Sequence, residues 1–155
     1  MDRLWQLSNL ELHMMCYDVM ETGHMTGYIQ FIDNATVITE MHKNYNFYSG
    51  PFSKFTVREH FLNWHKKHKT FEKASCKTEV EAKLKQYHST FIRSFAGQCV
   101  ATYVLGVRDR HPGNYMLHNP TGKFFHIDFG HFLDHCKKKN GFSRDREPFI
   151  YSKEL

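Results

Sequence analysis

Two short stretches decide the fold: Arg-Asp-Arg-His-Pro-Gly-Asn at residues 108–114 and His-Ile-Asp-Phe-Gly at residues 126–130. The chain between them reads as two short strands, residues 115–118 and 123–127, joined by Asn-Pro-Thr-Gly, which is a strong turn signal. An antiparallel hairpin of this length folds the end of the first stretch back beside the second. The sequence therefore predicts one site that is built from both stretches.

The residue types in these stretches suit a site for Mg²⁺. The hairpin is expected to place Asn114 beside Asp128, and an amide oxygen and a carboxylate are hard ligands that leave Mg²⁺ other positions for water and phosphate. Asp109 lies at the entrance of the first strand, where it can orient or deprotonate an attacking hydroxyl group. An isolated Asp-Phe-Gly is often a chance match, but here it coincides with Asp-x-x-x-x-Asn and a suitable hairpin. The combination predicts a phosphoryl-transfer site.

Together, the two stretches resemble the signature of the phosphoinositide 3-kinase and 4-kinase superfamily, Asp-Arg-His-x-x-Asn followed by His-Ile-Asp-Phe-Gly. A protein kinase would have His-Arg-Asp in the catalytic loop and Ala-Pro-Glu after the activation segment, whereas residues 107–109 of this chain are Val-Arg-Asp. The resemblance implies ATP as the phosphoryl donor, with Mg²⁺ bound by Asn114 and Asp128. It also implies that His111 acts as a base or stabilises the transferring phosphoryl group, and that His131 lies near that group.

The segment after Asp-Phe-Gly, residues 131–149, resembles the activation segment of class I phosphoinositide 3-kinases, with a lysine run, an Arg-acid-Arg step and then Pro-Phe. Basic side chains near a phosphoryl-transfer centre suit an inositol headgroup that already bears phosphates. The residues expected to bind the headgroup are Lys137, Lys138, Lys139, Arg144 and Arg146. A lysine run is more often a solvated loop, and its position close after Asp-Phe-Gly is what favours the headgroup role. The implied reaction is phosphorylation of the 3-hydroxyl, with phosphatidylinositol 4,5-bisphosphate as the expected substrate.

Residues upstream of the catalytic stretches resemble the hinge that holds the adenine ring of ATP. Residues 27–32, Gly-Tyr-Ile-Gln-Phe-Ile, resemble the hinge strand, and Met-Met-Cys-Tyr at residues 14–17 resembles the segment before it. By this resemblance Gln30 and Ile32 are hinge positions. The side chains expected to line the adenine pocket are Tyr17, Ile29, Met116 and Ile127. Without the resemblance, the same residues would be read as half-buried strand residues.

The resemblance covers the middle of a catalytic domain and implies an α+β, protein-kinase-like fold. Residues 1–34 correspond to the end of the small lobe with the hinge, and residues 35–155 to the large lobe, with the catalytic loop at 107–114 and the activation segment at 128–149. The phosphate-covering loop and the phosphate-binding lysine of the family lie upstream of the hinge and are not found, so most of the small lobe is expected to be absent. We therefore expect the 155 residues to be inactive alone and to act within a longer enzyme.

Apolar periodicity predicts the other elements. Residues 1–16 should form a helix, a second helix should begin at Thr56 and run through Trp64, and the longest should span about residues 78–105. The continuous apolar stripe of the longest helix should bury its later half on most sides. Two strands, at residues 27–32 and 35–40, are expected to pair through a turn at Asp33-Asn34.

Composition points to a cytoplasmic protein with an anionic partner. The net charge is +5, and a hydrophobic content of 41% is sufficient for a packed core. The four cysteines form no Cys-x-x-Cys pair, which is typical of reduced thiols. No nucleic-acid recognition module is found, so a phosphoinositide at a membrane surface is the expected partner. The protein should be recruited to membranes peripherally, and the resemblance implies a regulatory subunit as well.

Two alternative functions remain open. The enzymatic alternative is a phosphatidylinositol 4-kinase or a related protein kinase. Pro112 and Gly113 replace a more polar pair and are more similar to the relatives that phosphorylate proteins. The alternative from another class is a non-catalytic large-lobe module that binds a regulatory subunit or a lipid. The intact Asp109, Asn114 and Asp128 argue against that second alternative, whereas the missing small lobe favours it.

Overall fold

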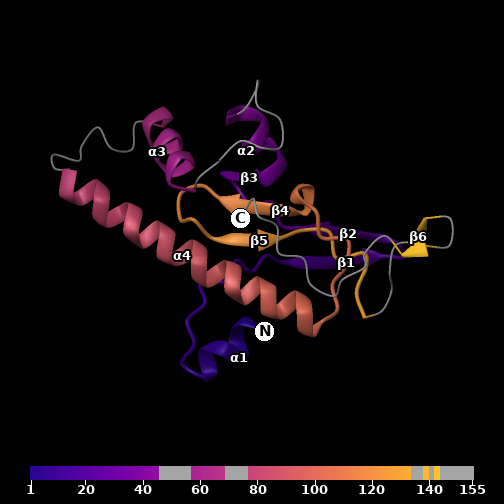
Figure 1. Cartoon of the computed structure of the whole chain (residues 1–155). Helices are drawn as coiled ribbons and strands as arrows, with labels where there is room; N and C mark the ends of the chain where they lie inside the picture. The colour runs from indigo at the N-terminus through magenta and orange to yellow at the C-terminus, as the bar shows by residue number, and fades with distance from the viewer. Residues whose placement is uncertain (46–56, 69–76, 134–137, 140–141, 144–155) are drawn as a thin grey trace.

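The computed structural model describes residues 1–45, 57–68, 77–133, 138–139 and 142–143. This part of the chain is a mixture of helices and strands, which confirms the α+β class (Figure 1). In chain order the elements are α1 (Asp2–Leu7), β1 (Val19–Gly23), β2 (Thr26–Ile29), β3 (Ala35–Val37), α2 (Ile38–Tyr45), α3 (Val57–Lys67), α4 (Lys77–Val104), a 3-10 turn (Pro112–Asn114), β4 (Tyr115–His118), β5 (Phe124–His126), β6 (Lys138–Lys139) and β7 (Phe142–Ser143).

The central feature is a three-stranded sheet in the order β3-β4-β5. Its β4–β5 hairpin lies where the sequence predicts it, with Tyr115 opposite His126 in antiparallel register. The turn closes through a hydrogen bond of 2.8 Å from the Gly122 N–H to the His118 carbonyl. Gly122 adopts a left-handed φ of 76°, which a glycine reaches without steric strain. The turn chemistry read from the sequence therefore fixes the hairpin that carries the candidate site.

The hydrophobic core lies between this sheet and three helices. Figure 1 shows α4 along the β5 side of the sheet and α2 next to β3. The ring of Phe61 on α3 packs against Tyr87 on α4, with 4.5 Å between the ring centroids. The buried cluster comprises Ile38, Met41, Phe61, Leu84, Tyr87, Phe91, Tyr115, Leu117 and Phe124. Burial of this much aromatic and aliphatic surface is the main stabilising contribution to the sheet's position.

The first helix is shorter than predicted. α1 ends at Leu7 instead of continuing to residue 16. Asn9 adopts a φ of 56°, the Asn9 N–H bonds to the Gln6 carbonyl at 3.0 Å, and the Leu10 N–H bonds to the Trp5 carbonyl at 2.8 Å. These two bonds form a Schellman cap, in which asparagine can take the left-handed position that ends a helix. The apolar spacing of residues 1–16 was therefore misleading, because the local cap signal at Asn9 ends the helix first.

The predicted hairpin through Asp33 and Asn34 is wrong. β2 pairs with β1 in a separate two-stranded sheet, and β3 pairs with β4. The Asn119 N–H donates to the Asn34 carbonyl at 2.9 Å, which extends the β3–β4 pairing to the residue expected in the turn. Helix α2 begins at Ile38, inside the segment predicted as strand. The predicted turn at Asp33-Asn34 does form, with Asn34 at a φ of 55°, but β3 takes its hydrogen bonds from the distant β4 and not from β2.

The helices α3 and α4 confirm two predicted elements, but the burial of α4 differs. The predicted N-cap at Thr56 lies outside the described residues. Along α4, Val100, Tyr103 and Val104 are 49%, 61% and 59% exposed, so the expectation that its later half is buried on most sides is wrong. One stripe of α4 contacts the sheet and α3, and the segment of residues 11–14 lies against Arg93 and Gly97, but the side chains near the end of the helix stay exposed. Within the described ranges, no helix combines the length and apolar content required to cross a membrane.

Replacing Gly122 with alanine should destabilise the hairpin. A Cβ at this position would lie 2.8 Å from the Tyr87 carbonyl oxygen, and the backbone φ of +76° strains any L side chain. We expect the Gly122→Ala variant to lose about 1–3 kcal/mol of unfolding free energy, measured by denaturant titration. The Thr121→Ser variant, at the exposed neighbouring position, serves as the control because it keeps the hydroxyl that bonds to His118 and Lys123. A loss no larger than that of Thr121→Ser would contradict this interpretation.

Candidate active site

The hairpin brings the two predicted stretches together at its open end. The Ile127 N–H donates to the Asn114 carbonyl at 3.0 Å, which extends the strand pairing to the residue before Asp128. Within the first stretch, the Asn114 side-chain nitrogen donates to the Asp109 carbonyl and the Asn114 N–H donates to the His111 carbonyl, both at 2.8 Å. The predicted loop therefore closes on itself and is fixed to the start of the second stretch.

Arg110 joins the two stretches, although the sequence analysis assigned it no role. Its Nε donates to the Arg108 carbonyl at 2.8 Å, its Nη1 donates to the Ile127 carbonyl at 2.9 Å, and its Nη2 donates to the Asp128 carbonyl. The guanidinium group also lies 5.6 Å from the ring centroid of Phe129. Its planar set of donors can bind several carbonyl groups at once. Arg110, which is only 8% exposed, therefore holds the predicted catalytic loop and the Asp-Phe-Gly backbone together.

Both candidate catalytic aspartates have unusual backbone conformations. Asp109 has a φ of 57° and Asp128 a φ of 59°, in the left-handed region that non-glycine residues occupy at a cost of about 1–3 kcal/mol. Such conformations persist where surrounding contacts hold them, and the bonds from Arg110 and Asn114 are made to the carbonyl groups of these two residues. Asp109 is only 5% exposed, whereas Asp128 is exposed. The Asp128 carboxylate is thus accessible to a ligand.

The two histidines of the site are placed differently. His111 is exposed, and its Nδ1 accepts a hydrogen bond from the Gly113 N–H at 3.1 Å. Because Nδ1 is an acceptor here, the neutral ring carries its proton on Nε2. His131 is half-buried, and its carbonyl accepts a hydrogen bond of 2.8 Å from the Arg108 N–H. The chain after Asp-Phe-Gly therefore returns to the start of the catalytic loop.

Three of the residues predicted to line the adenine pocket lie around the β4–β5 hairpin. The Tyr17 hydroxyl donates to the His126 carbonyl at 3.2 Å, and its ring meets Phe125 edge-on at 6.3 Å between centroids. Met116 lies opposite Phe125 in the strand register, and Ile127 follows directly after β5; both are half-buried. Burial raises the pKa of Tyr17 against the opposing charge of Arg110, so the hydroxyl keeps its proton at neutral pH.

The remaining predicted hinge residues belong to a different part of the structure. Ile29 ends β2 and is 69% exposed, and Gln30 is also exposed. Gln30 is tied to Asp18 twice: its N–H donates to the Asp18 carbonyl at 2.8 Å, and its Oε1 accepts from the Asp18 N–H at 3.0 Å. Ile32 is half-buried. These bonds fix the residues that follow the β1–β2 hairpin, but the described contacts do not join Ile29 and Gln30 to the β4–β5 cluster.

The side chains expected to bind a headgroup cannot be placed in the same way. Lys137, Arg144 and Arg146 lie outside the described residues. Lys138 and Lys139 form β6, where they pair with Ser143 and Phe142 of β7, and only their backbone positions are described. Their role therefore stays a prediction.

His126, the last residue of β5, is a buried and neutral histidine next to the candidate site. Burial, together with the nearby charge of Arg110, lowers the pKa of His126 to about 3. Its ring packs against Tyr115 with 4.9 Å between centroids. A protonated imidazole at this position would be both desolvated and close to the guanidinium group, so the ring stays neutral at physiological pH. Because His126 is neutral, it does not repel the guanidinium group of Arg110, which is held by its hydrogen bonds to the backbone carbonyls.

Comparison with known proteins places the whole chain in one family. Residues 1–155 match the sequence profile described as phosphatidylinositol 3- and 4-kinase. Phosphatidylinositol 3-kinase 1 of Dictyostelium discoideum is 40% identical over 155 residues, with 100% of this chain and 9% of the relative covered. The human phosphatidylinositol 3-kinase C2 domain-containing subunit gamma is 35% identical over 155 residues, with the same 100% and 9% coverage.

A third relative is also described as a phosphatidylinositol 3-kinase. Phosphatidylinositol 3-kinase age-1 of Caenorhabditis elegans is 35% identical over 172 residues, with 100% of this chain and 14% of the relative covered. The chain thus spans between 9% and 14% of the length of these three relatives. The match over every residue, together with the Asp-Arg-His-x-x-Asn and Asp-Phe-Gly stretches joined in space, gives the identity: the chain belongs to the phosphatidylinositol 3- and 4-kinase family.

Proposed function

We propose that this chain supplies the catalytic loop and the metal-binding loop of a phosphatidylinositol 3-kinase. The reaction would transfer the γ-phosphoryl group of ATP to the 3-hydroxyl of an inositol lipid, with phosphatidylinositol 4,5-bisphosphate as the proposed substrate. One observation carries the proposal. Asp109, Asn114 and Asp128 lie on two loops that the hydrogen bonds of Arg110 hold together. The relatives named above are described as phosphatidylinositol 3-kinases, which supports the same assignment.

The donor atoms of Asn114 and Asp128 fit Mg²⁺. The Asn114 nitrogen is bonded to the Asp109 carbonyl, so the amide oxygen is the atom that can bind a cation, and the Asp128 carboxylate is exposed. In the described part of the chain, no three His, Cys, Asp or Glu side chains form a metal-binding group. Water and the phosphates of ATP would therefore complete the coordination. When bound, Mg²⁺ would neutralise negative charge on the phosphates.

Asp109 would orient the hydroxyl group of the lipid. Asp109 is almost fully buried, and its backbone carbonyl accepts a hydrogen bond from the side-chain amide of Asn114. A carboxylate shielded from water interacts more strongly with a hydroxyl group that reaches it than a solvated carboxylate does. Burial and a fixed backbone are therefore consistent with positioning as the role of Asp109.

His111 would donate a hydrogen bond to the transferring phosphoryl group. With Nδ1 occupied by the Gly113 N–H, the exposed Nε2 carries the proton of the neutral ring and is a donor. This geometry favours phosphoryl stabilisation over the role of a base. His131 would lie near the same group, as the family resemblance implies. The proposed adenine-binding side chains are Tyr17, Ile29, Gln30, Ile32, Met116 and Ile127.

The two roles of His111 can be separated by substitution. A glutamine side chain can donate a hydrogen bond but cannot take up a proton at neutral pH. We expect His111→Ala to lower kcat by about 10²-fold and His111→Gln to lower it by only about tenfold, in steady-state assays with ATP and lipid. Equal losses in the two variants would contradict the donor role. Unchanged unfolding midpoints would confirm that both variants are folded.

The lysine run can be tested through lipid preference. The variant with both Lys137→Ala and Lys138→Ala should keep its turnover on phosphatidylinositol but lose about tenfold or more on lipids that already carry phosphates. The measurement is turnover on both lipids with the full-length protein. The matched control replaces Lys66 and Lys67 with alanine at the end of α3, where both are exposed. Equal loss on both lipids would argue against headgroup recognition.

The position that is phosphorylated tests the proposed function itself. The full-length protein, given ATP, Mg²⁺ and phosphoinositide vesicles, should form products phosphorylated at the 3-position, identified by headgroup analysis. Products phosphorylated only at the 4-position, or phosphorylation of protein alone, would overturn the assignment in favour of a related kinase. In this proposal the protein works in the cytoplasm, is recruited peripherally to a phosphoinositide-containing membrane and is bound by a regulatory subunit.

A further inference from the structure

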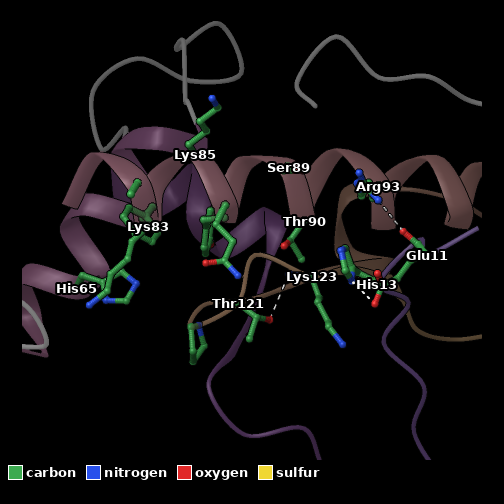
Figure 2. A pocket seen from close by; sticks show the side chains of 15 residues that line it. Glu11, His13, His65, Lys83, Lys85, Ser89, Thr90, Arg93, Thr121 and Lys123 are labelled. Atoms are coloured by element: carbon green, nitrogen blue, oxygen red, sulfur yellow. Dashed lines mark hydrogen bonds and ion pairs between the residues drawn. The ribbon is translucent and has the colours of Figure 1, made fainter. Parts of the chain in front are cut away.

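A basic cavity of about 800 Å³ lies at the turn end of the β4–β5 hairpin. The candidate active site lies at the open end of the same hairpin, and the two sites share no residue. Figure 2 shows the cavity between α4, the end of α3, the hairpin turn and the segment that contains Glu11 and His13. Nothing in the proposed reaction uses this surface.

The charges that line the cavity are mostly positive. The cationic side chains are Lys83, Lys85, Arg93 and Lys123, the histidines His13 and His65 also line the cavity, and among the described residues Glu11 is the only acidic one. Figure 2 shows Lys83 with His65 at one end, Lys123 along the middle, and Arg93 with His13 at the other end. Glu11 is itself engaged there, because its carbonyl accepts from Arg93 at 3.2 Å and its carboxylate lies 3.9 Å from the His13 ring.

Lys83, at one end of the cavity, and Lys123, along its middle, contribute two of its positive charges. Lys83 forms an ion pair of 3.1 Å with Glu79 one turn earlier, but both side chains are about half exposed, and such pairs contribute only about 0.3–0.5 kcal/mol. No ion pair joins Lys123 to a carboxylate in the part of the chain that the structure describes. Together with burial, the charge of Lys83 lowers the pKa of His65. Burial and the charge of Lys123 likewise lower the pKa of His118. Each of the two lysines therefore creates a positive electrostatic potential around itself.

The dimensions of the cavity favour an extended ligand. Lys83 and Arg93 lie ten residues apart on α4, which corresponds to about 15 Å along the helix axis. That distance matches about five residues of extended peptide. A single phosphate group could not contact both ends at once, and a flat membrane surface does not fit a concave site. Pro120, which is half-buried, lines the same cavity and can contact an apolar side chain, whereas Phe61 and Tyr87 border the cavity from within the core.

We propose that this groove binds an extended acidic peptide segment of a partner protein. Carboxylates spaced along the peptide would pair with Lys83, Lys123 and Arg93, and an apolar residue between them would contact Pro120. The hydroxyl groups of Ser89, Thr90 and Thr121 also line the cavity and can bond to the peptide backbone. The spread of cations supplies the charge complementarity, and the concave shape of the cavity adds contact area.

The test measures peptide binding to the full-length protein by fluorescence anisotropy. The probe is a labelled peptide of about six residues with alternating glutamate and leucine, and its control has glutamine in place of every glutamate. The informative variant combines Lys83→Glu with Lys123→Glu. The matched variant combines Lys66→Glu with Lys67→Glu, which makes the same change in net charge on exposed residues of α3 outside the cavity.

We expect the Lys83/Lys123 variant to bind the acidic peptide at least about tenfold more weakly, and the Lys66/Lys67 variant to bind within about twofold of the wild type. The glutamine peptide should bind at least about tenfold more weakly to the wild type. Raising the salt from about 0.05 M to about 0.5 M should weaken binding of the acidic peptide, because the contacts are solvent-accessible. Lipid kinase turnover without peptide should be unchanged in both variants.

Several results would overturn the proposal. Equal weakening by the two double variants would mean a response to net charge alone, and no weakening by Lys83/Lys123 would exclude the groove. Displacement of the peptide by inorganic phosphate at comparable concentration would indicate a small-anion site, and tighter, lysine-dependent binding of phosphatidylserine vesicles would indicate a membrane site. A loss of basal turnover in the folded Lys83/Lys123 variant would assign these lysines to the catalytic reaction instead.

Discussion

Asp128→Asn in the full-length protein is expected to lower turnover by at least about 10³-fold. The carboxylate of Asp128 is exposed at the end of the hairpin and is the charged member of the proposed Mg²⁺ pair with Asn114. An amide in its place is nearly the same size but supplies no negative charge for the metal ion. Asparagine also tolerates a φ near 59°, which Asp128 adopts, so the backbone should not change. The loss should therefore reflect the metal ion and not the fold.

The measurement is steady-state lipid phosphorylation at increasing Mg²⁺ concentrations, accompanied by an unfolding curve. A weakened metal site should be partly restored by a higher Mg²⁺ concentration, while the unfolding midpoint stays close to that of the wild type. Asp33→Asn, at an exposed position in the loop between β2 and β3, is the matched control and should have no effect on turnover. Turnover of Asp128→Asn within about tenfold of the wild type would remove this carboxylate as the metal ligand.

Arg110→Ala is expected to lower kcat by about 10²- to 10³-fold, with a smaller change in the KM for ATP. The substitution removes the bonds from one guanidinium group to the Arg108, Ile127 and Asp128 carbonyls, and with them the link between the two catalytic loops. Without that link, Asp109 and Asp128 can leave their left-handed conformations. A shift of about 1 Å between reacting groups is sufficient for a loss of this size.

Arg110→Lys distinguishes positioning from charge. A lysine keeps the positive charge but is a point donor that cannot bind carbonyls in several directions, so its kcat should stay within about tenfold of the alanine variant. Turnover should be measured at a temperature where each variant is fully folded, because a purely structural effect would then disappear. Arg58→Ala, which removes an exposed ion pair of 3.6 Å with Glu81, is the control. Wild-type kcat in Arg110→Lys would refute the positioning role.

The parts of this fold that sequence analysis predicted correctly are governed by nearby residues. The β4–β5 hairpin follows from alternating apolar residues and a turn whose Gly122 takes the left-handed conformation. The long helix follows from a sustained apolar stripe, and its bounds, Lys77–Val104, lie close to those predicted. The end of α1 was also a local signal, because Asn9 caps the helix, but the apolar spacing beyond it was given more weight.

The errors concern contacts between distant segments. β3 pairs with β4 across about eighty residues of chain, and no pattern within residues 27–40 identifies that partner. The exposure of Val100 and Tyr103 likewise depends on what packs against α4, which its own stripe does not specify. Arg110 was missed for a similar reason. Its partners are backbone carbonyls, which are present in every residue and leave no trace in the sequence.

By itself, the sequence determined the family, the chemical types of the candidate catalytic residues and the hairpin that joins them, because motif spacing and turn geometry are local properties. Only the tertiary structure decided how the site is held: the three bonds of Arg110, the left-handed backbones of Asp109 and Asp128, and the hydrogen bond that fixes the His111 ring. The basic groove beside α4 has the same origin, since its side chains come from four separate segments of the chain. Their proximity is set by packing of the core, which brings together residues that no local pattern connects.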